Sequence, residues 1–134
     1  MSEVPAPGPI KPLRIFVMEN HRDTLMYLQM YLESLGHAVD CASSVGEALA
    51  GLGKADYDVL LSDIGLPDGT GWELLRQVRA RSAQPLFGIA MSGFGTNADH
   101  ERSRQAGFSH HLLKPFEPAA LDVALTEAAC AMPG

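Results

Sequence analysis

Five short apolar runs alternate along the chain with longer segments in which apolar residues recur at helical spacing. Runs of this length are typical of strands buried on both faces of a parallel sheet, whereas the longer segments predict amphipathic helices. Asp23 suits the first turn of the first helix and Gly36 suits its end. The predicted strands are residues 13–18, 37–42, 57–63, 86–92 and 109–114, and the predicted helices are residues 23–35, 45–52, 71–81, 97–107 and 118–132.

This alternation of strands and helices predicts the fold class. Parallel strands need right-handed crossover connections, and the crossover helices then cover both faces of the sheet. The expected architecture is therefore α/β, with a doubly wound five-stranded parallel sheet and five helices. Ligands of such folds bind beyond the carboxyl ends of the strands, so the chemistry of this chain is expected there.

The length of 134 residues suits one domain with a single core. Residues 2–12 read SEVPAPGPIKP, contain four prolines and offer little that could pack. We therefore predict a disordered leader or linker at 1–12 and one domain at 13–132.

Charge and cysteine content exclude several function classes. The formal net charge is -6, and no run of Lys or Arg could neutralise successive phosphates, so direct nucleic-acid binding is not expected. Cys41 and Cys130 are far apart and form no metal-ligand motif. With no apolar stretch long enough to span a bilayer and no signal peptide, we expect a cytoplasmic protein without membrane insertion.

Polar residues suited to chemistry stand at the ends of four predicted strands. Glu19 and Asn20 follow the first strand, and Asp63, Ser92 and Lys114 end the third, fourth and fifth. These side chains are expected to converge. Oxygen ligands from Glu19, Asn20 and Asp63 would suit a hard cation such as Mg²⁺.

A carboxylate beside a metal and a lysine can act as a nucleophile toward phosphorus and form an aspartyl phosphate. Asp63 is the candidate nucleophile. The metal and the ammonium of Lys114 would offset charge on the phosphoryl oxygens, and Ser92 would donate a hydrogen bond to the product.

Four motifs in this order and spacing resemble the response-regulator receiver domains of two-component signalling, over about residues 13 to 130. They are the acidic-pair position Glu19-Asn20, DIGLPDGTG from Asp63 to Gly71, MSGFG around Ser92, and LLKPF from Leu112 to Phe116. Together they form a far more specific signal than any one of them. The resemblance implies the flavodoxin-like fold with strand order 2-1-3-4-5.

The resemblance also implies a role for each matching residue. Asp63 would be the phosphoacceptor, Ser92 the switch hydroxyl and Lys114 the phosphate-sensing lysine, and these three are the candidate catalytic residues. Gly65 would lend its backbone carbonyl to the Mg²⁺ site formed with Glu19, Asn20 and Asp63. The bond before Pro115 resembles the family's cis peptide.

Two positions depart from the family pattern. The second residue of the acidic pair is usually Asp, and Asn20 carries no charge, which should weaken metal binding. His111 stands where the family commonly places Tyr or Phe as a switch residue, and an imidazole there can titrate near neutral pH. The other histidines, His21, His37, His100 and His110, are expected to be solvated.

The function that the resemblance implies is Mg²⁺-dependent phosphoryl transfer from a phosphohistidine to Asp63, which would switch the binding of a downstream effector protein. The donor would be a histidine kinase or a histidine phosphotransfer protein, and the chain would be a monomer or weak dimer. It is not expected to be a conventional enzyme, since at most it would catalyse its own phosphorylation and dephosphorylation. The segments GLPDGTGWELLR and GFSHHLLKPFEP look more like receivers of hybrid kinases, and the chain would be a stand-alone regulator or a receiver from a longer protein.

Three alternative functions belong to different classes of protein. A pseudo-receiver would act through phosphorylation-independent protein contacts, and Asn20 motivates it, although Asp63, Ser92 and Lys114 argue against it. An aspartyl phosphatase usually has a second acid two residues after its nucleophile, where this chain has Gly65. A flavodoxin is rejected because the loop after its first strand is rich in Ser, Thr and Gly, and here that loop reads ENHRDT.

Overall fold

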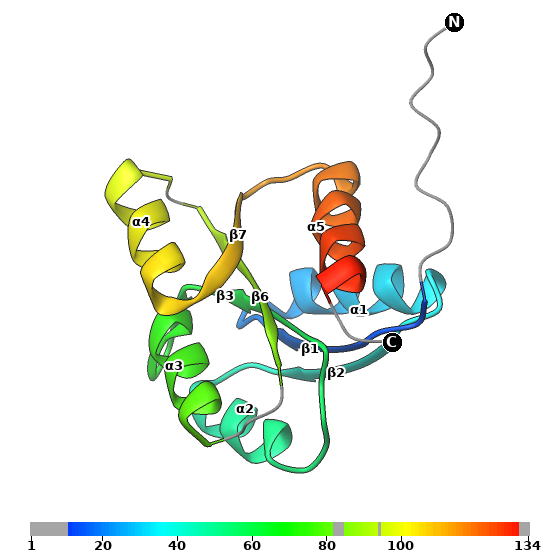
Figure 1. The fold of residues 1–134 in the computed structure, drawn as a ribbon, viewed down its shortest axis with the longest axis horizontal. Coiled ribbons are helices and arrows are strands. Elements are labelled where there is room, and N and C mark those ends of the chain that lie inside the picture. Colours follow the sequence, from blue (N-terminus) through cyan, green and yellow to red (C-terminus); the bar gives the residue numbers. More distant parts are fainter. Residues whose placement is uncertain (1–10, 82–84, 94, 132–134) are drawn as a thin grey trace, which may run out of the picture.

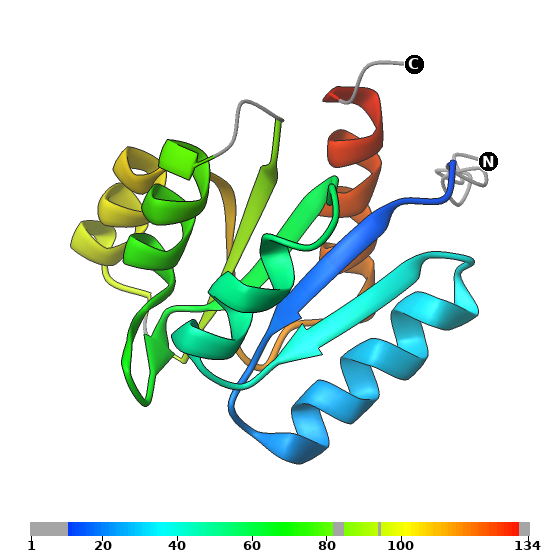
Figure 2. The same cartoon turned by 90° about the horizontal axis from the view of Figure 1, so that it is seen from below.

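The protein has three layers, a central parallel sheet with helices on both faces (Figures 1 and 2). The structure is a computed structural model that describes residues 11–81, 85–93 and 95–131. Most of the predicted leader, residues 1–10, and the last predicted helical residue, Met132, lie outside the described residues. The elements in chain order are β1 Arg14–Met18, α1 Arg22–Ser34, β2 Ala38–Ala42, α2 Val45–Leu52, β3 Val59–Asp63, β4 Gly65–Leu66, β5 Gly69–Thr70, α3 Gly71–Arg81, β6 Phe87–Ser92, α4 Asn97–Ala106, β7 Phe108–Leu113 and α5 Pro118–Ala131.

The five long strands form one sheet in the order β2-β1-β3-β6-β7. Every neighbouring pair in it is parallel. Counting only these long strands, the order is 2-1-3-4-5, so the doubly wound flavodoxin-like topology expected from the sequence is confirmed. The order reverses between β1 and β3, and the carboxyl ends of these two strands meet at the switch point where such folds bind ligands.

Alternation along the strands divides the core into two clusters. In β1, Ile15 and Val17 join the cluster under α1 and α5, whereas Phe16 and Met18 join the cluster under α2 and α3. Successive side chains of a strand point to opposite faces, so a continuous apolar run supplies both clusters at once. This explains why the predicted strands lack polar alternation.

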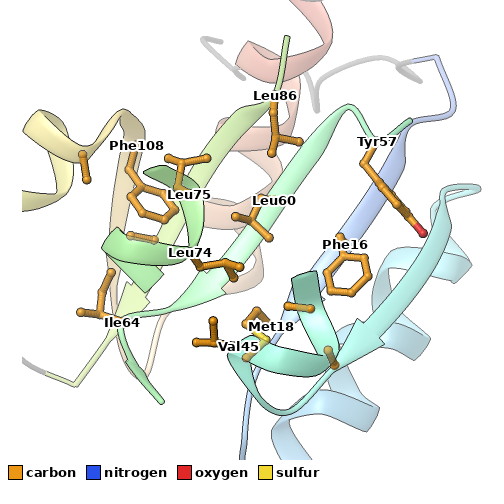
Figure 3. Close-up of a cluster of buried hydrophobic side chains, with 14 residues drawn as sticks. Phe16, Met18, Val45, Tyr57, Leu60, Ile64, Leu74, Leu75, Leu86 and Phe108 are labelled. Carbon is orange, nitrogen blue, oxygen red and sulfur yellow. The ribbon is translucent and has the colours of Figure 1, made fainter. Parts of the chain in front are cut away.

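The cluster on the α2 and α3 side covers one face of the central strands β1 and β3 (Figure 3). Leu60 of β3 and Leu74 and Leu75 of α3 are fully buried in it. Phe108 at the start of β7 closes the cluster near α4 (Figure 3). The packing holds α3, which directly follows the loop after Asp63, against the sheet.

A short antiparallel hairpin, β4 and β5, lies between β3 and α3, and the sequence pattern did not predict it. Two strands of two residues leave no periodicity to detect. Asp68 at the turn of this hairpin accepts hydrogen bonds from the backbone N–H groups of Val45 at 2.8 Å and Gly46 at 3.1 Å. These hydrogen bonds hold the loop after Asp63 against the first turn of α2. They also satisfy N–H groups that have no partner within the helix.

No helix in the described part of the chain has the length and apolar character needed to cross a lipid bilayer.

Replacing Gly71 with Ala should destabilise the fold, because the backbone of Asp63 leaves no room for a Cβ atom. Such an atom would lie 2.4 Å from the carbonyl oxygen of Asp63 and 2.8 Å from Oγ of Ser62. Overpacking of this kind costs about 1–3 kcal/mol, which urea unfolding would measure. Gly65→Ala is the matched control, since nothing lies within 4 Å of a Cβ atom there. Equal unfolding midpoints for the two variants would contradict the expectation.

Candidate functional site

The predicted site residues stand where strands end at one edge of the sheet. Asp63 and Ser92 are the last residues of β3 and β6, and Glu19 and Lys114 directly follow β1 and β7. Parallel strands bring their carboxyl ends to the same edge. Of these residues, the structure brings Glu19, Asp63 and Lys114 into direct contact.

Backbone hydrogen bonds between neighbouring strands continue past the strand ends and fix this edge. The N–H of Ile64 donates to the carbonyl of Met91 at 3.0 Å, and the N–H of Lys114 donates to the carbonyl of Ser92 at 2.7 Å. The peptide bond between Lys114 and Pro115 is cis, as the resemblance implied.

Lys114 joins the two carboxylates of the site. Its Nζ donates a hydrogen bond to Oε1 of Glu19 and another to Oδ2 of Asp63 at 3.2 Å. Glu19 is fully buried and Asp63 is 7% exposed, so both carboxylates depend on protein partners more than on water. The backbone N–H of Ile64 also donates to Oδ1 of Asp63 at 3.1 Å.

The two carboxylates respond to this environment in opposite directions. Burial works against ionisation of Glu19, but hydrogen bonds from Lys114 and from the backbone N–H of His21 outweigh it and lower the pKa of Glu19. Burial, together with the neighbouring charge of Glu19, raises the pKa of Asp63 to about 6, although Lys114 opposes the rise. One ammonium between two carboxylates leaves a net negative charge, and an added cation would relieve it.

Three side chains present ligand atoms that could hold a metal ion. Oxygens of Glu19 and Asp63 and a ring nitrogen of His21 all lie within 4.8 Å of one another. Two of these residues, Glu19 and Asp63, belong to the predicted Mg²⁺ site. Asn20 lies between Glu19 and His21 in the chain and is exposed, and Gly65 is exposed at the start of β4.

His21 was expected to be solvated, and its side chain is 74% exposed. The sequence did not predict that its Nδ1 lies 3.1 Å from Oε2 of Glu19. The signal in the sequence was its position, two residues after Glu19 and immediately before α1.

The predicted switch residues are in contact. Oγ of Ser92 lies 2.7 Å from Nε2 of His111, and the imidazole is half-buried in β7. His111 therefore faces the strand end that carries Ser92.

The expectation that His37 is solvated was wrong. His37 is 5% exposed, and its Nδ1 accepts a hydrogen bond from the backbone N–H of Leu13 at 3.0 Å. Burial lowers the pKa of His37, which favours the neutral ring that such an acceptor requires. This position lies before β2, at the opposite end of the sheet from Asp63.

Comparison with known proteins identifies related sequences. The family model described as response regulator receiver domain matches residues 15–126. The chain is 37% identical over 130 residues to the virulence sensor protein BvgS of Bordetella bronchiseptica, a match that covers 90% of this chain and 10% of that protein. It is also 33% identical over 105 residues to the transcriptional regulatory protein ResD of Bacillus subtilis, covering 78% of this chain and 43% of that protein. The chain thus spans less than half the length of these two relatives.

A solved structure agrees with the sequence matches. The response regulator receiver domain protein (CheY-like) from Methanospirillum hungatei JF-1 superposes with a TM-score of 0.82 at 27% identity, over 90% of this chain and 95% of the other.

The raised pKa of Asp63 should make its charge destabilising at neutral pH. The pKa rises from 3.8 to about 6 on folding, so the folded state binds more protons between these values and the free energy of unfolding falls as pH rises through this window. In metal-free buffer, Asp63→Asn should therefore be more stable than the natural chain at pH 7 by roughly 1–3 kcal/mol. At pH 4 the free energies of unfolding of Asp63→Asn and the natural chain should differ much less. Urea unfolding at pH 4 and pH 7 would measure both differences.

Asp56→Asn provides the matched control, since Asp56 is exposed before the start of β3, at the far end of that strand. The same Asp63→Asn difference at pH 4 and pH 7 would contradict the assigned titration.

Proposed function

Because the chain belongs to the response regulator receiver domains of two-component systems, we propose that Asp63 accepts a phosphoryl group from a phosphohistidine. The observation that carries the proposal is the contact between Lys114 and both carboxylates of the site. It places an ammonium 3.2 Å from the proposed nucleophile. Because its pKa is about 6, Asp63 is mostly ionised at pH 7 and available for attack.

In the proposed reaction, a carboxylate oxygen of Asp63 forms a bond to phosphorus while the phosphorus–nitrogen bond of the phosphohistidine breaks. The electron pair of that bond stays on the donor imidazole, which then takes up a proton. Lys114 would offset the negative charge of the phosphoryl oxygens, and the hydroxyl of Ser92 would donate a hydrogen bond to one of them. Ser92 is suited to this role because it ends β6, the strand paired with β3.

Mg²⁺ is the proposed cofactor. Glu19 and Asp63 would supply carboxylate oxygens, Asn20 its amide oxygen and Gly65 its backbone carbonyl. The clustering of ligand atoms from Glu19, His21 and Asp63 within 4.8 Å supports the position. When bound, the ion supplies positive charge that offsets the phosphoryl oxygens.

The proposed donor is a histidine kinase or a histidine phosphotransfer protein, and the proposed reader is a downstream effector protein. The match to one tenth of a sensor protein and to part of a transcriptional regulatory protein supports both roles. The match to the sensor supports the further proposal that this receiver works as one domain of a hybrid kinase.

Incubation with acetyl phosphate and Mg²⁺ should add the mass of one phosphoryl group to the natural chain, as intact-mass spectrometry would show. Asp63→Asn should gain nothing, because the amide is not a nucleophile toward phosphorus. Asp56→Asn should be labelled like the natural chain, since Asp56 lies beyond the other end of β3.

A natural chain that takes up no label from acetyl phosphate or from a phosphorylated histidine phosphotransfer protein would contradict the proposal. That result would favour the pseudo-receiver, which acts through protein contacts alone. Asn20 is the residue that motivates this second candidate, since a neutral amide replaces a carboxylate in the metal site.

Asn20→Asp should tighten Mg²⁺ binding roughly tenfold, because a second charge in the acidic pair adds about 1 kcal/mol or more of attraction to the cation. Isothermal titration calorimetry would measure the dissociation constant. Asn97→Asp at the exposed start of α4 adds the same charge away from the site and should leave the affinity unchanged. Equal affinities for Asn20→Asp and the natural chain would show that Asn20 is not a ligand.

A further inference from the structure

A line of hydrogen bonds leads from Ser92 at the sheet edge to the indole of Trp72 in α3. Ser92 Oγ lies 2.7 Å from Nε2 of His111, and the other ring nitrogen of His111, Nδ1, lies 2.8 Å from Oγ of Ser103 in α4. The indole Nε1–H of Trp72 donates to the same Oγ of Ser103 at 2.8 Å. Four side chains from β6, β7, α4 and α3 are thus linked end to end.

The indole N–H is a donor only, so Oγ of Ser103 accepts its hydrogen bond. Ser103 Oγ must accept from Trp72, and among the described residues its other hydrogen-bond partner is Nδ1 of His111. Ser103 is buried and its hydroxyl proton needs an acceptor, so Ser103 donates this proton to Nδ1 of the neutral imidazole. The ring proton of His111 is then on Nε2, which donates to Ser92.

This assignment makes Ser92 Oγ an acceptor toward His111. That contact does not use the proton of Ser92, which in the proposed function is donated to an oxygen of a phosphoryl group on Asp63. The ring of a Tyr or Phe at position 111 contains no nitrogen, so it could not accept the hydrogen bond from Ser103. The imidazole thus adds a polar connection that an aromatic hydrocarbon ring lacks.

Packing holds the members of the line in place. Ser103 is 1% exposed, so its two hydrogen bonds are shielded from water. The ring of His100 in α4 stacks on His111 at 4.3 Å between centroids, with 10° between the planes. The guanidinium of Arg102 lies 4.1 Å from the centre of the Trp72 ring, so the line ends at the surface between α3 and α4.

We propose that His111 is a positioning residue that orients the hydroxyl of Ser92 and transmits the phosphorylation of Asp63, through Ser103, to Trp72. This inference rests on the proposed function of Asp63. When Ser92 turns to a phosphoryl oxygen, its bond to His111 changes, and the bonds of Ser103 and Trp72 change with it. The phosphoryl group shifts the domain between two arrangements only by such differences in contacts, and the surface between α3 and α4 becomes part of the output.

The chain contains a single tryptophan, so a ¹⁵N-labelled sample has one indole N–H signal, and that signal reports the end of the line. Beryllofluoride with Mg²⁺ serves as the probe that mimics the phosphoryl group, and the ¹⁹F spectrum of the same sample gives its occupancy. At full occupancy the indole signal of the natural chain should shift. Before addition, the ring ¹⁵N signals of His111 should show a proton on Nε2 and none on Nδ1.

His111→Phe and Ser103→Ala should each abolish the shift at the same ¹⁹F occupancy, because each breaks the line. His110→Phe is the matched control, since the neighbouring imidazole of β7 contacts Glu127 of α5 instead and lies outside the line. Its indole signal should move as in the natural chain. Ser109→Ala is the corresponding control for Ser103, because Ser109 is exposed on β7.

The outcomes separate this inference from the proposed function. Bound beryllofluoride with an unmoved indole signal in the natural chain would overturn the inference and leave the phosphoacceptor role intact. An equal shift in His111→Phe would overturn the role of His111. Absence of bound beryllofluoride, together with absence of mass labelling, would overturn the proposed function and this inference with it.

Discussion

The site depends on one ammonium shared between two buried carboxylates. Lys114 contacts Glu19 and Asp63 at once, and neither acid has enough water around it to be stabilised by solvent. Removing Lys114 would be costly, because the two buried carboxylates would then lack a compensating charge. The shared environment shifts the two carboxylates in opposite directions, since the pKa of Glu19 is lowered while that of Asp63 is raised to about 6. The acid with the raised pKa is the one that also faces the proposed chemistry.

This arrangement of charges is possible because the parallel sheet gathers the ends of distant segments. Glu19 and Lys114 are 95 positions apart in the chain, and β1 and β7 bring them to one edge. The central strands β1, β3 and β6 carry mainly apolar side chains on both faces, and the charged groups of the site stand at the strand ends. The apolar interior thereby presents a small polar edge at which the charged side chains meet.

The hydrophobic pattern was sufficient to predict the five long strands, their parallel arrangement and the edge at which Glu19, Asp63 and Lys114 meet. The order of the strands came from the resemblance to receiver domains, because a hydrophobic pattern does not say which strands are neighbours. It could not predict the contact of His21 with Glu19, which depends on how the chain turns before α1. It also could not predict the line through Ser103 to Trp72, because that line joins side chains of separate elements whose relative rotation is set by packing. Burial of His37 was missed for the same reason, since nothing local marks a histidine that accepts a hydrogen bond from Leu13.

The division of the core into two clusters affects how the sequence of this domain can diverge during evolution. The cluster under α1 and α5 and the cluster under α2 and α3 have no residue in common, and the sheet separates them. Additivity holds best for positions that share no contacts. Substitutions that adapt one helical surface to a new partner therefore leave the packing beneath the opposite surface largely unaltered. The residues on each helical face can therefore be substituted independently, while the charged residues at the carboxyl ends of the strands are retained.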